Sequence, residues 1–221
     1  MRSSAQAPAA QNTPEALTAA YNQAMQARDW TGAVTDAQKI VDLTATAQNL
    51  WLLANAQLSS GANEESLGTY VLAVVAAQQE KPAQGQPDAA WREDLAKIYI
   101  GKGNALLKLN RTTEAVEEYN HAAEFAANPG PAYFNICAVL YNSGDTTNSP
   151  AACRKCLQVD PSKIDAWFIL GSVLFVNSPT DAQGKVIAST ETREALGKYL
   201  ALASDGPHAA DVKAMLEMIA N

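Results

Sequence analysis

The sequence predicts an all-α chain built from repeated pairs of helices, and three observations indicate this fold class. Long runs consist of Ala, Leu, Glu, Gln and Lys, whose side chains lose little conformational freedom in a helix. The β-branched and aromatic runs that would mark strands are scarce. Large and small residues recur with a period of 34 residues, and a fixed period of that size is typical of an α-solenoid.

The period is clearest in the first helix of each unit. Tyr99, Tyr133 and Trp167 are spaced by 34 residues, and each is followed by a small residue four positions later and a leucine three positions after that. These followers are Gly103, Leu106, Cys137, Leu140, Gly171 and Leu174. The second helix repeats a spacing of four and then three residues, in Ala115, Tyr119 and Ala122, in Ser149, Cys153 and Cys156, and in Ala195, Tyr199 and Leu202. Small residues at these positions let the two backbones approach closely, and stacked units share one core.

The pattern predicts five units and a helical cap. The units cover residues 14–46, 47–80, 96–129, 130–163 and 164–206 of a single repeat domain at 14–221, after a flexible tail at 1–13. Residues 208–220 form an amphipathic helix that caps the last unit. Two insertions depart from the register, at Lys81–Asp88 and from Ser178 to the helix expected near Thr190. Asp88 is the expected N-cap of a helix about 20 residues long.

This register resembles the tetratricopeptide repeat (TPR) family, in the form of a bacterial-type scaffold protein. The stretch from Ala132 to Pro161 carries the family's pattern, with Tyr133 and Cys137 in the first helix, although Cys153 stands where an aromatic residue is usual. The resemblance implies a non-enzymatic scaffold for protein–protein interaction. It would bind a segment of a partner protein in a concave groove lined by the first helix of each unit.

The resemblance also implies which residues face that groove. Asparagines there can hydrogen-bond the backbone of an extended peptide, and aromatic rings offer rigid contact area. Carried over position by position, the groove residues are Asn22, Trp51, Asn55, Lys97, Ile100, Asn104, Phe134, Tyr141, Phe168 and Phe175. Family members that bind acidic chain termini use a basic clamp, but here Thr18, Leu52 and Gly101 stand at clamp positions, so binding of chaperone tails is not expected.

The three cysteines allow at most one internal disulfide and do not fix the cellular compartment. Cys153 and Cys156 have the C-x-x-C spacing of redox motifs, but they lie inside a helix at packing positions. Core packing, a structural disulfide, and catalysis or metal binding therefore remain open for them. The resemblance implies that Cys137 and Cys156 occupy facing small positions, so Cys137–Cys156 is the bridge expected in an extracytoplasmic protein.

Charge and composition limit the partners. The net charge is −7 and the Lys and Arg residues are dispersed, which does not favour nucleic acid. No apolar stretch approaches the roughly 20 residues needed to span a bilayer, so no membrane insertion is expected. The two histidines, His121 and His208, lie in different units and are expected to be structural. The expected partner is a protein or peptide, with no cofactor and no metal.

Several alternatives stay open from the sequence alone. The N-terminal residues lack the apolar region of an intact signal peptide and look like residues that follow a signal cleavage site, although an ordinary tail fits as well. The compartment is thus either extracytoplasmic (periplasmic) or cytoplasmic. The rival functions are a thiol redox accessory protein using Cys153 and Cys156, and a self-associating structural repeat protein. The oligomeric state is open.

Overall fold

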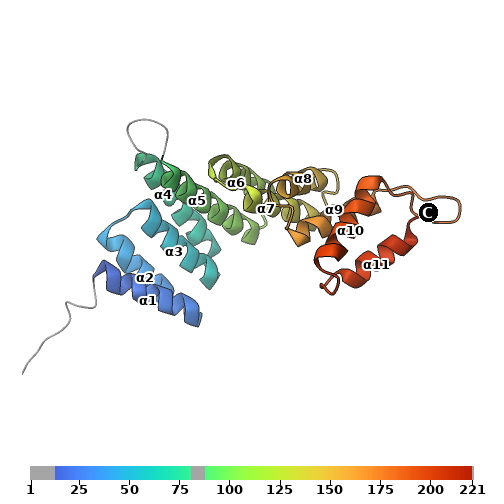
Figure 1. Cartoon of the computed structure of the whole chain (residues 1–221). Coiled ribbons are helices and arrows are strands. Elements are labelled where there is room, and N and C mark those ends of the chain that lie inside the picture. The colour runs from blue at the N-terminus through green and yellow to red at the C-terminus, as the bar shows by residue number, and fades with distance from the viewer. Residues whose placement is uncertain (1–12, 81–87, 221) are drawn as a thin grey trace, which may run out of the picture. The chain divides into compact units, whose positions relative to one another are not determined.

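A computed structural model of the chain describes residues 13–80 and 88–220, and these residues confirm the all-α fold class (Figure 1). Within them, β pairing is limited to two isolated bridges, Thr180–Val186 and Val186–Ile219. The helices of the described residues are α1 (Pro14–Ala27), α2 (Trp30–Leu43), α3 (Ala47–Ser60), α4 (Asn63–Gln79), α5 (Ala89–Lys108), α6 (Thr112–Phe125), α7 (Gly130–Asn142), α8 (Ser149–Val159), α9 (Ile164–Val176), α10 (Thr190–Leu202) and α11 (Ala209–Met218).

Side-chain caps fix the starts of several helices. The side chains of Thr13, Asp29, Thr46 and Ser189 each accept a hydrogen bond from a backbone N–H in the first turn of the following helix. Asp88 does the same for α5, accepting from the N–H of Ala90 at 2.6 Å. The predicted start and length of this helix are confirmed, since α5 has 20 residues. Residues 1–12 of the predicted tail at 1–13, and residues 81–87 of the predicted insertion at Lys81–Asp88, lie outside the described residues.

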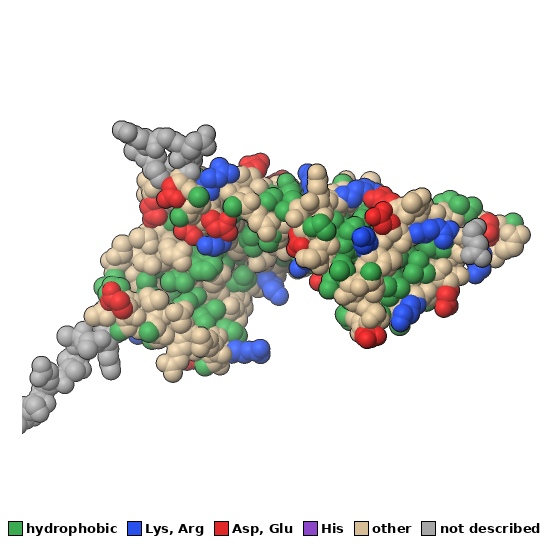
Figure 2. Space-filling model, viewed as in Figure 1, with side chains coloured by type: hydrophobic (Ala, Val, Ile, Leu, Met, Phe, Trp, Pro, Cys, Tyr) green, Lys and Arg blue, Asp and Glu red, His purple; other side chains and the backbone are tan. Residues whose placement is uncertain are grey.

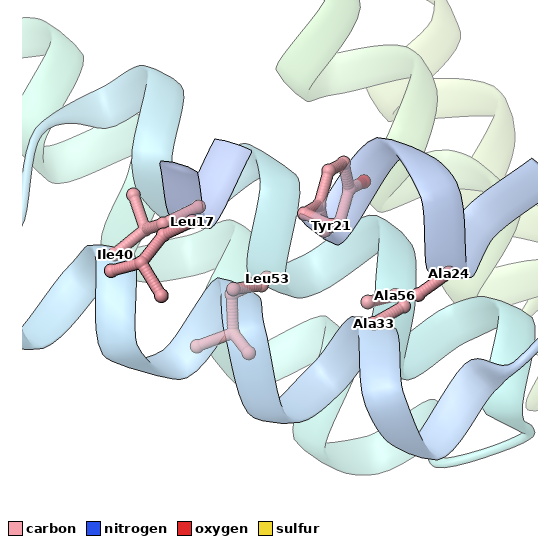
Figure 3. Packing of buried hydrophobic residues seen from close by; sticks show 8 residues of the cluster. Leu17, Tyr21, Ala24, Ala33, Ile40, Leu53 and Ala56 are labelled. Carbon is pink, nitrogen blue, oxygen red and sulfur yellow. The ribbon is translucent and has the colours of Figure 1, made fainter. Parts of the chain in front are cut away.

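The chain divides into two compact units, unit 1 (residues 1–118) and unit 2 (residues 119–221), with the boundary inside α6. Each of them contains more than one of the repeats predicted from the sequence. In unit 1, consecutive helices from α1 to α5 pack against one another, and α3 also contacts α5. Figure 3 shows one core cluster of this unit, in which apolar side chains of α1, α2 and α3 meet. Ala33 and Ala37 in this cluster have no exposed surface, so α2 lies close against its neighbours. Burial of such apolar area is the main stabilising term, at about 25 cal/mol per Å².

In unit 2, α7 packs on α8 and α9, α9 packs on α8 and α10, and α11 covers α9 and α10. Leu196 and Tyr199 of α10 and Val212 of α11 have no exposed surface in the cluster that α11 covers. The predicted capping helix is thus present as α11, but it ends at Met218. Ile219 is extended because Val186, in the loop between α9 and α10, pairs with this end of the chain: its N–H donates to Met218 O and its C=O accepts from Ala220 N, both at 2.9 Å.

The disulfide joins Cys137 of α7 to Cys153 of α8, so the expected Cys137–Cys156 pairing is wrong. The hydroxyl of Ser149 donates to the Cys137 carbonyl at 3.2 Å, which places the start of α8 against Cys137. Cys153 lies one helical turn after Ser149 on the same face, with Cα atoms of the two cysteines 4.9 Å apart. Cys156 follows almost a further turn on, which carries it out of reach, and it is a buried free thiol.

Candidate functional site

Five of the predicted groove residues lie on two neighbouring helices of unit 1. Trp51 and Asn55 are one turn apart on α3, and Lys97, Ile100 and Asn104 follow one face of α5, which contacts α3. Lys97 is exposed and the other four are half-buried. We refer to these five residues as the α3–α5 surface. It joins apolar, aromatic, amide and cationic groups.

A buried tyrosine positions the amide of this surface. Tyr70 of α4 has no exposed surface, and its hydroxyl donates a 2.6 Å hydrogen bond to Oδ1 of Asn55. Burial raises the pKa of Tyr70, so the hydroxyl keeps its proton and remains a donor. Because Oδ1 of Asn55 accepts this hydrogen bond, the orientation of the amide is fixed, and with it the direction of the two N–H donors on Nδ2. Sequence reasoning missed this role of Tyr70, which was visible only as a packing residue.

A glycine lets α5 approach that tyrosine. A Cβ built on Gly101 would lie 2.4 Å from ring carbons Cε1 and Cζ of Tyr70 and 2.5 Å from its hydroxyl. No side chain fits there, so the close packing of α5 on α4 requires glycine at this position. Gly101 therefore fixes the Tyr70 ring, and through it the amide of Asn55.

The sixth predicted groove residue of unit 1 lies outside the α3–α5 surface, and the lysine of that surface is paired within its own helix. Asn22 is exposed on α1. Lys97 forms a 3.1 Å ion pair with Asp94, with both side chains 48% exposed. An exposed pair of this kind contributes little to stability, so Lys97 can exchange Asp94 for a partner's acceptor at small cost.

The predicted groove aromatics of unit 2 lie on α7 and α9, but other side chains of this unit already contact several of their rings. Tyr141 and Phe168 make an edge-to-face contact with ring centroids 6.5 Å apart. The His208 ring stacks on the Phe168 ring with centroids 3.8 Å apart, and the centroid of the Tyr199 ring lies 5.7 Å from that of Phe168. Phe168 is therefore a packing residue for the turn before α11 as much as a candidate contact. Its truncation would disturb the fold of unit 2.

The other two predicted aromatics of this unit have different surroundings. Phe175 packs against the core beneath α11. Phe134 lies under the ammonium of Lys163, which is 4.1 Å from the ring centroid. Phe134 and Lys163 also line a depression of about 310 Å³, together with residues that include Asn128, Asn135 and Asp160. Of the four, Tyr141 and Phe134 retain the character of candidate contacts.

The free thiol is poorly suited to redox chemistry. Cys156 is 1% exposed, and burial raises the pKa of its thiol to about 11. The thiolate is the reactive species, so this environment suppresses reactivity near neutral pH. In the described parts of the chain, no group of three or more His, Cys, Asp and Glu side chains is placed to hold a metal ion. No described helix is both long and apolar enough to cross a membrane.

On the face shown in Figure 2, acidic and basic side chains lie among hydrophobic and uncharged ones, and several of the acidic and basic groups adjoin each other. Unit 1 carries its apolar and amide contacts at α3 and α5, and unit 2 carries aromatic contacts at α7 and α9. The arrangement offers contact area and hydrogen bonds, which suit the binding of a polypeptide segment.

Comparison with known proteins agrees with the fold. The family model for the tetratricopeptide repeat matches residues 96–129. No curated protein matches in sequence. Among solved structures, the chain is similar to YrrB, described as a TPR protein with an unusual peptide-binding site, at 16% identity and a TM-score of 0.62 over 92% of this chain and 93% of that one.

Two further structures are similar at low identity. PilF of Pseudomonas aeruginosa is 11% identical with a TM-score of 0.66, over 93% of this chain and 86% of that one. A tetratricopeptide repeat protein from Parabacteroides merdae is 13% identical with a TM-score of 0.64, over 94% of this chain and 75% of that one. With its paired helices, its matched repeat at 96–129 and these structural neighbours, the chain has the fold of tetratricopeptide repeat proteins.

Proposed function

We propose that the protein is a non-enzymatic scaffold for protein–protein interaction, and that the α3–α5 surface binds an extended segment of a partner protein. The observation that carries this proposal is the Tyr70–Asn55 hydrogen bond of 2.6 Å, which holds an amide ready on a half-buried surface beside Trp51. Preorganised side chains bind with a smaller loss of conformational entropy.

The composition of the surface indicates the chemistry of the segment. The Nδ2 donors of Asn55 suit backbone carbonyls of an extended chain, and Trp51 and Ile100 offer apolar area to its side chains. Lys97 suits an acidic residue of the segment. The peptide-binding description of the similar protein YrrB is consistent with this proposal.

A photo-crosslinking experiment tests where a partner binds. The photoreactive residue p-benzoylphenylalanine is placed at Lys97 on the α3–α5 surface and, as a matched control, at Glu117, an exposed position of α6. In extracts of the native host, the variant labelled at position 97 should give one dominant crosslinked protein, and the variant labelled at 117 should not. Equal crosslinking from both positions would refute binding at this surface.

The redox alternative finds less physical support. Cys153 is engaged with Cys137 and has no exposed surface, and Cys156 is buried with a raised thiol pKa. A catalytic thiol needs access and a stabilised thiolate, and neither is present at these residues.

Self-association is a second candidate because α4 carries exposed apolar side chains. Val71, Leu72 and Val75 are 44%, 57% and 45% exposed, and they lie within one turn of each other. Static light scattering at rising protein concentration tests it. A constant monomer mass would remove this candidate, and a mass that rises in the wild type but not in Leu72→Gln would support it.

We also propose an extracytoplasmic location. The Cys137–Cys153 bridge supports it, because disulfides persist mainly in oxidising compartments. Peptide mapping of protein isolated from the host with thiols blocked at lysis should yield the linked peptides. Recovery of all three cysteines as alkylated thiols would contradict the proposal.

A further inference from the structure

A second candidate binding place lies in unit 2, in a groove between α8 and α10 whose floor is α9. The cavity has a volume of about 240 Å³, and its apolar lining comes from Leu157 of α8 and from Trp167 and Leu170 of α9. Arg154, Glu191 and Glu194 stand at its rim. We call these six residues the Trp167 groove. On α9, Trp167 points about 100° away from Phe168 and about 80° away from Phe175 around the helix axis.

The rim of this groove carries one uncompensated negative charge. Arg154 and Glu191 form a two-pronged ion pair, with Nε–Oε1 at 2.6 Å and Nη2–Oε2 at 2.9 Å. Hydrogen bonding to Arg154 lowers the pKa of the Glu191 carboxyl, so the two charges cancel. No hydrogen bond or ion pair joins the Glu194 carboxylate to another side chain in the described part of the chain.

The preceding repeat contains the equivalent groove, and there the chain supplies its own cation. Between α6 and α8, a cavity of about 300 Å³ is lined by residues that include Asn120, Tyr133, Ile136 and Asn148. Three of these, Asn120, Tyr133 and Ile136, lie 34 residues before Arg154, Trp167 and Leu170. The ammonium of Lys155 lies 5.4 Å from the centroid of the Tyr133 ring, as a cation–π contact.

Two sequence differences between the repeats make the Trp167 groove able to accept a cation from outside the chain. Tyr199 of α10 occupies the repeat position that Cys153 occupies in α8. Lys155 lies two residues after Cys153, and the residue two positions after Tyr199 is Ala201, which is exposed. Asn148 precedes Cys153 by five residues, and Glu194 precedes Tyr199 by five. The Trp167 groove therefore has an alanine at the position of Lys155 and a carboxylate at the position of Asn148. Within the described residues, no lysine or arginine is found over the Trp167 ring.

We propose that the Trp167 groove binds a lysine or arginine side chain of a partner protein. The apolar stem would lie on Leu157 and Leu170, and the charged head would lie over Trp167 within reach of Glu194. Tryptophan is the best aromatic partner for a cation, and long basic side chains bury their stems while their heads stay polar. A net charge of −7 on the whole chain favours the approach of a basic partner.

The test uses defined probes and the full chain. Acetylated and amidated glycine pentapeptides carry lysine, arginine, norleucine or glutamate at the central position. Binding is followed by NMR through the indole N–H of Trp167, which donates to Pro161 O at 2.8 Å and is assigned with a Trp167→Phe variant. The lysine and arginine peptides should bind at least about threefold more tightly than the norleucine peptide, as expected of a cation–π contact at an exposed site. The glutamate peptide should not bind.

Matched variants separate charge from shape. Glu194→Gln should reduce the preference for lysine over norleucine by about half or more, and Glu217→Gln, at an exposed glutamate of α11, should leave it unchanged. Ala201→Lys should place an internal lysine over Trp167, as Lys155 lies over Tyr133, and weaken binding of the basic peptides at least tenfold without lowering the melting temperature. Equal affinity for the lysine and norleucine peptides, or full affinity in Ala201→Lys, would overturn the proposal.

Discussion

Replacing Gly101 by alanine tests the contact that positions the α3–α5 surface. The new Cβ would lie 2.4 Å from the Tyr70 ring, well inside van der Waals contact, and the ring is fully buried. Overpacking of this kind costs about 1–3 kcal/mol. Displacement of the ring also breaks its hydrogen bond to Asn55, at about 1 kcal/mol.

Helix propensity acts in the opposite direction. Alanine is favoured over glycine inside a helix by about 1 kcal/mol. The net expectation for Gly101→Ala is a loss of about 1–3 kcal/mol. For a chain of this size, each kcal/mol corresponds to roughly 2–4 °C in melting temperature, so the loss is measurable by circular dichroism.

A second glycine supplies the matched control. Gly68 lies inside α4, is exposed, and has no atom within 4 Å of a Cβ built on it. Gly68→Ala should therefore raise the melting temperature through propensity alone. The two alanine substitutions should have opposite signs. An increase in melting temperature for both would show that Tyr70 is not held against α5 as described.

Four further predictions follow from the same contacts. Cys153→Ala should lower stability by about 3 kcal/mol in non-reducing melts, since the bridge spans 16 residues, and reductant should remove the difference from wild type. The buried Cys156 thiol has its pKa raised from 9.0 to about 11, so its contribution to stability is complete below about pH 9 and is lost as pH rises through 11. The melting advantage of wild type over Cys156→Ala should shrink across that range. Deletion of residues 208–221 should lower the melting temperature, because it uncovers Leu196 and Tyr199; an unchanged melt would refute the capping role of α11. Tyr70→Phe removes the hydrogen bond to Asn55, so it should weaken binding of a partner segment several-fold and lower stability by about 1 kcal/mol, measured by calorimetry and melting.

Much of the fold follows from the 34-residue register. The spacing of Tyr133 and Trp167, and the cap at Asp88, predicted helices that the structure contains. These features are local or periodic, so a single chain carries enough information to find them. The same register relates the cavity beside Tyr133, between α6 and α8, to the Trp167 groove.

Contacts that depend on the crossing of helices could not be read in the same way. The choice between Cys153 and Cys156 as partner of Cys137 depends on a displacement of about one helical turn along α8, which spacing does not fix. The stacking of His208 on Phe168 depends on the path of the turn between α10 and α11. The hydrogen bond from Tyr70 to Asn55 likewise needs the relative rotation of α3 and α4.

The affinity of a captured partner segment for Trp51→Ala tests the central claim most directly. The segment identified by crosslinking is titrated by calorimetry into wild type, Trp51→Ala and the exposed control Glu117→Gln, after melts show that all three are folded. Loss of a central aromatic contact should weaken binding by about 2 kcal/mol, or roughly 30-fold, and the control should match wild type. Equal affinity of Trp51→Ala and wild type would contradict the assignment of the α3–α5 surface as the binding site.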